Sequence, residues 1–206
     1  MSKRLEDVTY DIYLVGVGGQ GVLTIGDLIA EAAMETGLSA NFYPTKGMAQ
    51  RGGSVKVQVR LGRDVVGPQI PERKADLVIA MERSEALKAV RYVKPGGDFL
   101  LYGHVWEPTK VMLGKVAYPT LEQVSERIRQ AGGNLHYLDP KNLPRRDGAP
   151  LPPNVYVLGA AVGCTDLGEI LDAETVVGVV TGRWVKYAAV NEAAFRAGLG
   201  ADVEGG

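Results

Sequence analysis

The sequence predicts an α/β fold: an open mixed sheet with an antiparallel hairpin and a helical layer formed by the C-terminal part of the chain. Three observations predict it. An apolar segment at 10–17 leads through a glycine-rich turn into a helical pattern and then a short strand. The segment 54–61 alternates apolar and polar residues, as a half-solvated antiparallel strand does. Beyond residue 155 the periodicity is helical throughout.

The N-terminal elements predict a βαβ unit of a Rossmann-like sheet. After the glycine turn, apolar residues recur at helical spacing from Ile25 to Ala33, and Gly37 stands where a C-terminal cap belongs. A strand at 39–43 completes the unit, whose crossover should be right-handed. The segment 44–53 is expected to be a loop leading into the alternating strand, with no strand character of its own.

The middle of the chain predicts further strands separated by two helices. Strands are expected at 64–66, 75–81, 98–102, 110–117 and 135–138. Helices are expected at 84–92 and from Thr120 onwards, because Thr120 to Gln123 has the sequence of a capping box. The tripeptide Pro95-Gly96-Gly97 should break the chain before the strand at 98–102.

The C-terminal part is expected to be helical after a long surface loop at 141–153, which is rich in proline and polar residues. Three helices are predicted, at 155–164, 173–181 and 184–197. Asp172 should cap the second of them, and Gly198 should end the third. The tail 201–206 should fray. Because no repeat or linker is visible, residues 1–206 are predicted to form a single domain.

Charge and hydropathy exclude several classes of function. The 23 Lys and Arg residues balance 24 Asp and Glu residues, so no net field attracts nucleic acid or an anionic membrane surface. The first apolar run, 12–17, is far too short to span a bilayer, and no signal-peptide pattern precedes it. We therefore expect a cytoplasmic protein that binds neither nucleic acid nor membrane.

The single cysteine, Cys164, excludes an intrachain disulfide and a self-contained iron–sulfur cluster, which usually needs four thiolates. His104 and His136 lack the spacing of zinc ligands and have no neighbouring acid in the sequence, so both are expected to be structural. Cys164 is expected to be a small core residue, while Trp106 and Trp184 should anchor the core or an interface. No catalytic or metal-binding residue is predicted.

The glycine turn, GVGGQG at 16–21, has the spacing of a dinucleotide-binding fingerprint between a strand and a helix. That fingerprint also needs an acidic residue about 20 residues later to hold a ribose hydroxyl. No Asp or Glu occurs between Glu35 and Asp64, so the acidic residue that an NAD site needs is missing. Contact with another anion or phosphate, or a purely structural tight turn, remain as alternatives.

A second glycine-rich segment, 45–54, carries the cations Lys46 and Arg51. Such a loop at the end of a sheet can bring backbone N–H groups and both cations close to a carboxylate or phosphate. The alternative is a solvated lead-in to the next strand, with Arg51 on the surface.

Five segments together resemble the gamma-type domain of 2-oxoacid:ferredoxin oxidoreductases, most closely the beta subunit of indolepyruvate oxidoreductases. They are GVGGQG at 16–21, GMAQRGGSV at 47–55, ADLVIAME at 75–82, NVYVLGA at 154–160 and VNEAAFRAGL at 190–199. Their order and spacing cover most of the chain.

The resemblance implies an enzyme complex that decarboxylates an aryl pyruvate on thiamine pyrophosphate. It passes electrons through iron–sulfur clusters to ferredoxin and releases an acyl-CoA. This sequence has no diphosphate-binding motif of the Gly-Asp-Gly…Asn kind, so thiamine pyrophosphate with Mg²⁺ and the [4Fe-4S] clusters are expected in a partner subunit. The present chain should be inactive alone and help form the substrate or CoA side of the active site.

The residues expected to contact ligand or partner come from the two glycine-rich segments: Gly16, Gly18, Gly19, Gln20, Gly21, Lys46, Gly47, Met48, Gln50, Arg51, Gly52 and Gly53. Two other functions stay open. One is a stand-alone NAD-dependent oxidoreductase, which nicotinamide binding would support. The other is a nucleotide-binding regulatory module, which stable behaviour as a monomer without a partner would support.

Overall fold

A computed structural model describes residues 8–46, 53–62, 64, 67–106 and 117–205. Its main feature is a seven-stranded sheet with the order β2-β3-β1-β4-β5-β6-β9. The strands are β1 (Tyr10–Val17), β2 (Ala40–Lys46), β3 (Ser54–Leu61), β4 (Ala75–Ala80), β5 (Val93–Tyr102), β6 (Asn134–Leu138) and β9 (Glu204–Gly205). A separate two-stranded hairpin consists of β7 (Arg145–Arg146) and β8 (Ala149–Pro150).

The sheet is mixed, as the sequence predicts. Strands β1, β4, β5 and β6 are parallel neighbours, whereas β3 runs antiparallel to both β1 and β2. The predicted βαβ unit therefore has an unexpected feature, because β3 lies between its two strands. The apolar side chains of β3 explain the insertion. Val57, Val59 and Leu61 are fully buried and belong to the same core as the first helix.

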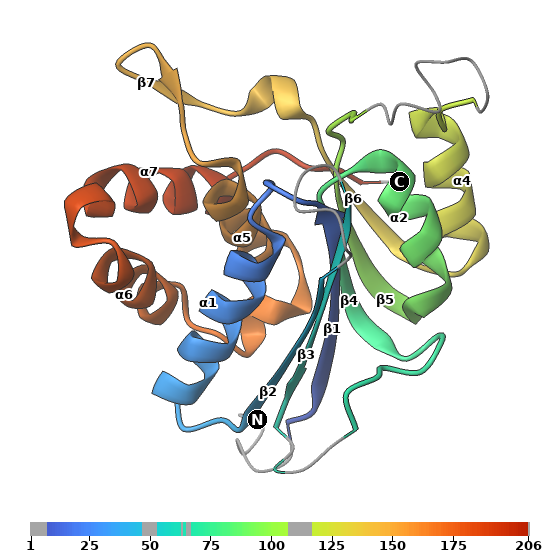
Figure 1. Cartoon of the computed structure of the whole chain (residues 1–206), viewed down its shortest axis with the longest axis horizontal. Helices are drawn as coiled ribbons and strands as arrows, with labels where there is room; N and C mark the ends of the chain where they lie inside the picture. The colour runs from blue at the N-terminus through green and yellow to red at the C-terminus, as the bar shows by residue number, and fades with distance from the viewer. Residues whose placement is uncertain (1–7, 47–52, 63, 65–66, 107–116, 206) are drawn as a thin grey trace.

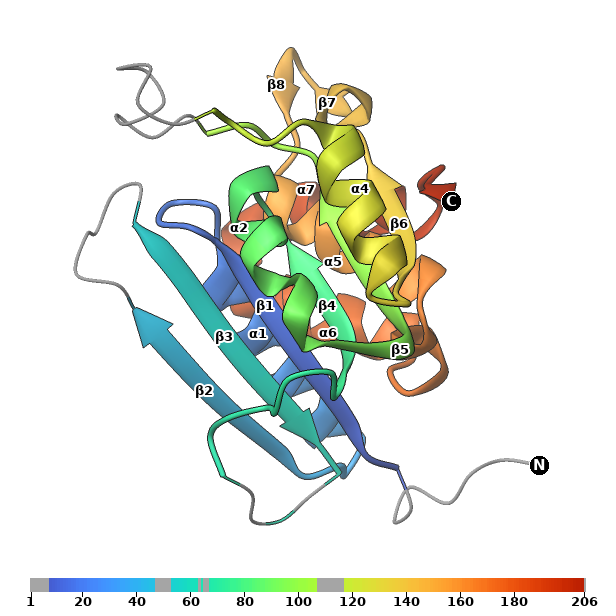
Figure 2. The ribbon, with the colours of Figure 1, turned by 90° about the vertical axis from the view of Figure 1, so that its right-hand side faces the viewer.

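Helices cover both faces of the sheet (Figure 1). On one face lie α1 (Val22–Glu35), α5 (Pro153–Cys164), α6 (Ala173–Arg183) and α7 (Ala188–Leu199). On the other lie α2 (Arg83–Ala89) and α4 (Leu121–Gln130), which in Figure 2 leave β2 and β3 without a covering helix. Among these helices, none in the described part of the chain has both the length and the apolar composition needed to cross a bilayer.

The strand β1 is buried along its whole length because it contributes to both cores. Ile12 and Leu14 belong to the larger core, with α1 and the C-terminal helices, whereas Tyr13 and Val15 belong to the smaller core under α2 and α4. Burial on both faces accounts for the apolar run at 12–17 by which the sequence predicts this strand.

The prediction that Gly198 ends the last helix is wrong, because α7 continues through it to Leu199. Gly198 instead lets α7 approach α5. A Cβ atom there would lie 1.9 Å from the carbonyl oxygen of Tyr156, and one at Gly159 would lie 2.0 Å from that of Phe195. Tertiary packing therefore determines the role of these glycines. The predicted helix at 184–197 also starts late, since Val185–Tyr187 is a separate 3₁₀ turn.

Three strand predictions need correction. Strand β5 starts at Val93 and runs through Pro95-Gly96-Gly97, because the chain bulges there with Gly96 at a φ of 76°. The prediction of a loop at 44–53 is wrong for residues 44–46, because β2 extends to Lys46. The tail expected to fray adds β9, where Gly205 pairs with His136 of β6.

Other expectations at the element ends are confirmed. Thr120 and Gln123 form the predicted capping box, and Asp172 caps α6 by accepting backbone N–H groups. The predicted strand 110–117 lies almost entirely outside the described residues, as does most of 64–66. The surface segment 141–153 contains the small hairpin in place of a structureless loop.

Candidate functional site

The glycine turn and the described ends of the second glycine-rich segment meet at the edge of the sheet where its parallel strands end. There β1 has a parallel neighbour, β4, on one side and the antiparallel β3 on the other. The helix that follows β1 packs on one face of the sheet and the helix that follows β4 packs on the other (Figure 1). Ligands of open α/β sheets bind at such a change of direction, because the loops diverge there and leave a crevice.

The side chain of Gln20 closes the glycine turn. Its Oε1 accepts a hydrogen bond from the backbone N–H of Val17 at 2.9 Å, and its Nε2 donates to the carbonyl oxygen of Met81 at 3.1 Å. Gly16 must lack a side chain, since a Cβ atom there would lie 2.7 Å from Oε1 of Gln20. Gly19 and Gly21 have φ values of 100° and 73°, which other residues rarely adopt.

The backbone N–H of Gly18 donates to the carbonyl oxygen of Gly53 at 2.9 Å, which joins the glycine turn to the chain just before β3. Lys46 ends β2 beside Val55 of the same hairpin. The five remaining predicted residues, Gly47, Met48, Gln50, Arg51 and Gly52, lie outside the described residues. The structure thus brings the described members of the two segments together at one edge.

Two helix N-termini converge beside the glycine turn. Gly21 precedes α1, and a Cβ atom on it would lie 2.7 Å from the side-chain Nδ2 of Asn154, in the first turn of α5. No side chain caps α1 or α5, whereas Glu82, Thr120 and Asp172 cap α2, α4 and α6. Backbone N–H groups at both ends carry partial positive charge, so this corner can accept an anion.

A hollow of about 490 Å³ opens next to this corner. It is lined by Val17, Gly18, Gly19, Gln20, Met81, Tyr102, His104, Trp106, Pro140, Leu143 and Pro153. The rings of Tyr102 and His104 are nearly parallel, with centroids 6.4 Å apart and planes 4° apart. Burial, followed by the effect of Tyr156 and Asp139, raises the pKa of Tyr102 to about 12, so its phenol is neutral at physiological pH.

Of this lining, the sequence predicted Gly18, Gly19 and Gln20 but not Tyr102, His104 or Trp106. Trp106 is 47% exposed, so it does not anchor the core and its other predicted role, at an interface, stays a prediction. Trp184 packs against the larger core, as predicted. A signal was present, because Tyr102 ends β5 and His104 and Trp106 follow it at alternate positions, as residues that share a side of an extended chain do.

The buried carboxylate of Glu82, just after β4, accepts several hydrogen bonds near the same edge of the sheet. Fully buried, it accepts hydrogen bonds from the Ser84 hydroxyl at 2.7 Å and the Glu85 backbone N–H at 2.8 Å, and also from the hydroxyl of Tyr118. Burial, together with the hydrogen bond to Glu82, holds the pKa of Tyr118 well above its usual value. Since these groups satisfy the carboxylate internally, we regard Glu82 as a structural residue.

His136 has an acidic partner, contrary to the prediction from its sequence neighbours. Its Nε2 lies 2.9 Å from Oδ1 of Asp98 on the adjacent strand, and Asp98 also accepts the backbone N–H of Asp166 at 3.2 Å. Hydrogen bonds with Asp98 and then with Cys164 raise the pKa of His136 to about 9. Cys164 is half-buried and packs against the larger core, as expected. In the described residues, no three His, Cys, Asp or Glu side chains are placed to hold a metal ion.

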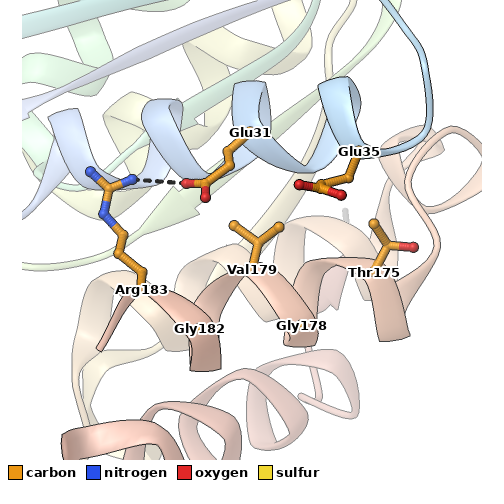
Figure 3. Close-up of a pocket in the computed structure, with 7 residues that line it drawn as sticks. All are labelled: Glu31, Glu35, Thr175, Gly178, Val179, Gly182 and Arg183. Carbon is orange, nitrogen blue, oxygen red and sulfur yellow. Dashed lines mark hydrogen bonds and ion pairs between the residues drawn. The ribbon is translucent and has the colours of Figure 1, made fainter. Parts of the chain in front are cut away.

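A second hollow, of about 500 Å³, lies between α1 and α6 (Figure 3). Glu31 and Glu35 of α1 face Thr175, Gly178, Val179 and Gly182 of α6, and Arg183 closes one end by pairing with Glu31 at 3.1 Å. None of the predicted site residues lines it. The hollow at the glycine turn is therefore the better candidate for a functional site.

Comparison with known proteins shows the family to which the chain belongs. Residues 11–201 match the family described as pyruvate ferredoxin/flavodoxin oxidoreductase. The chain is 33% identical to "Indolepyruvate oxidoreductase subunit IorB" of Methanothermobacter thermautotrophicus over 96% of this chain and 100% of that protein. It is 37% identical to the protein of the same name from Thermococcus kodakarensis, over 73% of this chain and 75% of that protein.

Solved structures share the fold. Pyruvate oxidoreductase subunit PORC from Thermotoga maritima superposes with a TM-score of 0.70 at 21% identity, covering 96% of this chain and 98% of that chain. The gamma subunit of a keto/oxoacid ferredoxin oxidoreductase from Geobacter sulfurreducens gives 0.62 at 24% identity, with 92% and 96% covered. The chain therefore belongs to the pyruvate ferredoxin/flavodoxin oxidoreductase family, as one of its oxidoreductase subunits.

Proposed function

We propose that this chain is a non-catalytic subunit of an oxidoreductase that converts an aryl 2-oxoacid such as indolepyruvate, with CoA and ferredoxin, into an acyl-CoA. The observation that supports the proposal best is the hydrogen bond from Gly18 to Gly53, because it joins the glycine turn, which borders an open hollow, to the described end of the second glycine-rich segment. The names of the similar proteins support the substrate class.

In such a reaction, cofactors carry out the decarboxylation and the electron transfer, and this chain has few residues that could bind them. A [4Fe-4S] cluster takes four thiolates, and the sequence contains one cysteine. We therefore assign thiamine pyrophosphate with Mg²⁺ and the clusters to a partner subunit, which would decarboxylate the substrate and pass its electrons to ferredoxin.

The role of this chain would be to bind and orient. The uncapped N-termini of α1 and α5 offer backbone N–H groups to a carboxylate or phosphate. The segment from Lys46 to Gly53 would contact either the same ligand or the partner subunit, with Lys46 and Arg51 as its cations. By excluding water and holding the substrate or CoA, the chain would complete an active site centred on the partner.

Reconstitution tests this proposal. The chain is co-expressed with the thiamine-binding subunit of the same host, and the reduction of a ferredoxin surrogate is measured with an aryl pyruvate and CoA. We expect turnover only when both subunits and CoA are present. Normal turnover by the partner alone would contradict the proposal. Reduction of NAD by the purified chain would favour a stand-alone dehydrogenase instead.

A further inference from the structure

A further hollow, of about 500 Å³, lies on the face of β3 that α2 and α4 leave uncovered (Figure 2). It shares no lining residue with the hollow at the glycine turn, and none of the site residues predicted from the sequence lines it. Its volume is in the range of pockets that hold small molecules. We call it the β3 hollow.

Polar side chains of β3 form a row on this face. They alternate with apolar side chains that enter the larger core on the opposite face, as in a half-solvated strand. Residues opposite each other in an antiparallel pair point to the same face, so Gln58 lies on the side of Tyr13 of β1, which belongs to the smaller core. Lys56 points to the same side, because it stands two residues earlier on the strand. The members of the row are Ser54, Lys56, Gln58 and Arg60.

Residues 69–71 form one wall of the β3 hollow, and two members of the row hold this wall in place. Oε1 of Gln58 accepts the backbone N–H of Ile70 at 2.5 Å. Arg60 donates to the carbonyl oxygens of residues 67 and 69 at 3.1 and 3.4 Å. Ile70 is 2% exposed and packs in the smaller core. The wall is therefore fixed by the protein itself, and a ligand would not have to order it.

Lys56 is the one member of the row that has no partner among the described residues. The hydroxyl of Ser54 donates to Glu85 at 2.7 Å. The guanidinium of Arg60 pairs with the buried Asp11 at 2.9 Å. Lys56 is half-buried and lines the β3 hollow, yet no hydrogen bond or ion pair joins it to the part of the chain that the structure describes. Partial removal of an ammonium group from water costs free energy unless an anion offsets it, so the hollow favours an anionic occupant.

The other polar groups of the lining favour a carboxylate over a phosphate. Thr45 of β2 lies opposite Lys56, so its hydroxyl can donate to the same anion. Glu72 also lines the hollow, and its carboxylate lies 3.5 Å from the guanidinium of Arg91. Glu72 repels any anion in the hollow, and this repulsion is about twice as strong for a doubly charged phosphate as for a singly charged carboxylate.

An apolar surface lies beside these polar groups. The ring of Tyr92 stacks on that of Tyr13, with centroids 4.0 Å apart and planes 14° apart. Ile70 and Pro71 line the same hollow. The organic part of a small ligand can pack against these side chains while its charged end stays at Lys56.

We propose that the β3 hollow binds a small organic carboxylate, with the ammonium group of Lys56 as its counter-ion and the side chains of Tyr92 and Pro71 against its apolar part. Lys56 is the one cation on the described lining. The proposal is independent of the proposed function, because the residues that carry it line no part of the hollow at the glycine turn.

A titration of the full chain, followed by backbone NMR, tests this site. The probes are benzoate and benzamide, which share a ring and differ in charge. The N–H of Ile70 reports the β3 hollow, and the N–H of Gly18 reports the hollow at the glycine turn. With benzoate we expect saturable shifts at Ile70, with a dissociation constant on the order of 1 mM for so small a ligand. Benzamide should bind about tenfold more weakly or not at all, because it lacks the charge that Lys56 pairs with. Phenyl phosphate, which carries nearly two negative charges at pH 8, should also bind more weakly than benzoate.

Substitutions of Lys56 identify the counter-ion. Lys56→Gln should weaken benzoate binding at Ile70 by about tenfold or more, which is the effect of losing a charge-assisted hydrogen bond. Lys56→Arg keeps the charge and should keep the binding. The matched control is Lys186→Gln, at an exposed lysine between α6 and α7, which should leave binding unchanged. Lys56→Gln should also keep the wild-type midpoint of urea unfolding, because Lys56 has no partner in the described structure to lose.

Several results would overturn the proposal. Wild-type affinity for benzoate in Lys56→Gln would show that Lys56 is not the counter-ion. Equal affinity for benzoate and benzamide would show that the hollow does not select an anion. Shifts at Gly18 without saturable shifts at Ile70 would place benzoate in the other hollow, and the absence of saturable shifts at both would mean that neither binds it. Tighter binding of phenyl phosphate than of benzoate would overturn the assignment of a carboxylate.

Discussion

The side-chain amide of Gln20 donates to the backbone carbonyl of Met81 at 3.1 Å, and this bond ties the glycine turn after β1 to the end of β4. The same side chain accepts the N–H of Val17, so one residue satisfies backbone groups of two adjacent strands. Gln20 therefore shapes the candidate site from within the turn, and the conformation of the glycines depends on it.

Replacing Gln20 with Ala should destabilise the chain by about 1–3 kcal/mol, because two partly buried backbone groups lose their partners. The measurement is the free energy of unfolding from urea titration. The matched control is Gln130→Ala, whose side chain bonds only to Glu126 on the surface of α4 and should cost less than about 0.5 kcal/mol. Equal effects of the two substitutions would mean that the turn holds its shape without Gln20.

Two helix-interior glycines should respond oppositely to alanine. Gly198→Ala places a methyl group where the Tyr156 carbonyl oxygen lies 1.9 Å away, so it should cost about 2–3 kcal/mol as α5 and α7 separate. Gly178→Ala in α6 meets nothing within 4 Å, and it should stabilise the chain by about 0.5–1 kcal/mol through helix propensity. Thermal unfolding of both variants tests the pair, and a stabilising Gly198→Ala would refute the close helix contact.

The pair of His136 and Asp98 predicts a pH-dependent stability. The pKa of His136 is raised to about 9, so its stabilising effect is complete below pH 6.5 and is lost as the pH rises through 9. Burial acts to raise the pKa of Asp98, but the hydrogen bonds from His136 and from the Asp166 backbone N–H outweigh it and lower that pKa. The contribution of Asp98 is therefore present above pH 3.8 and lost in more acidic solution.

Between pH 4 and 6.5 the wild-type chain should exceed His136→Gln in unfolding free energy by about 1–2 kcal/mol. This advantage should shrink steadily between pH 6.5 and 9. In an Asp98→Asn background most of the pH dependence should vanish, because the main cause of the shift is gone. A difference between wild type and His136→Gln that stays constant from pH 5 to 9 would contradict the ion pair.

The second glycine-rich segment supplies a prediction about function. The sequence predicts that Arg51 lies at the surface, so Arg51→Ala should leave folding intact, because a surface charge contributes little to stability. It should weaken turnover or assembly of the complex by about 1.5–3 kcal/mol if a charge-assisted hydrogen bond is lost. Steady-state kinetics of the reconstituted complex measure this, with Arg129→Ala on α4 as the control. Normal assembly with wild-type kcat and KM values would show that Arg51 binds neither ligand nor partner.

Local chemistry was sufficient to predict several elements of the fold. The capping box of Thr120 and Gln123, the cap at Asp172 and the helical spacing from Ile25 to Ala33 all involve groups a few residues apart. The buried strand β1 and the alternating strand β3 follow for the same reason, since each carries its burial pattern in its own residues. The resemblance to the family rests on such local segments too, and the comparisons confirm it.

Only the tertiary structure decided which distant residues meet. It inserted β3 between β1 and β2, paired His136 with Asp98 across 38 positions, and brought Trp106 to the same hollow as Pro140 and Pro153. It also placed Gly198, which the sequence led us to expect at a helix end, inside α7 at the contact with α5. The physical reason is that strand order and helix contacts depend on the free energy of packing the whole core, to which every element contributes. Periodicity and capping report only the hydrogen bonds and burial of a single element.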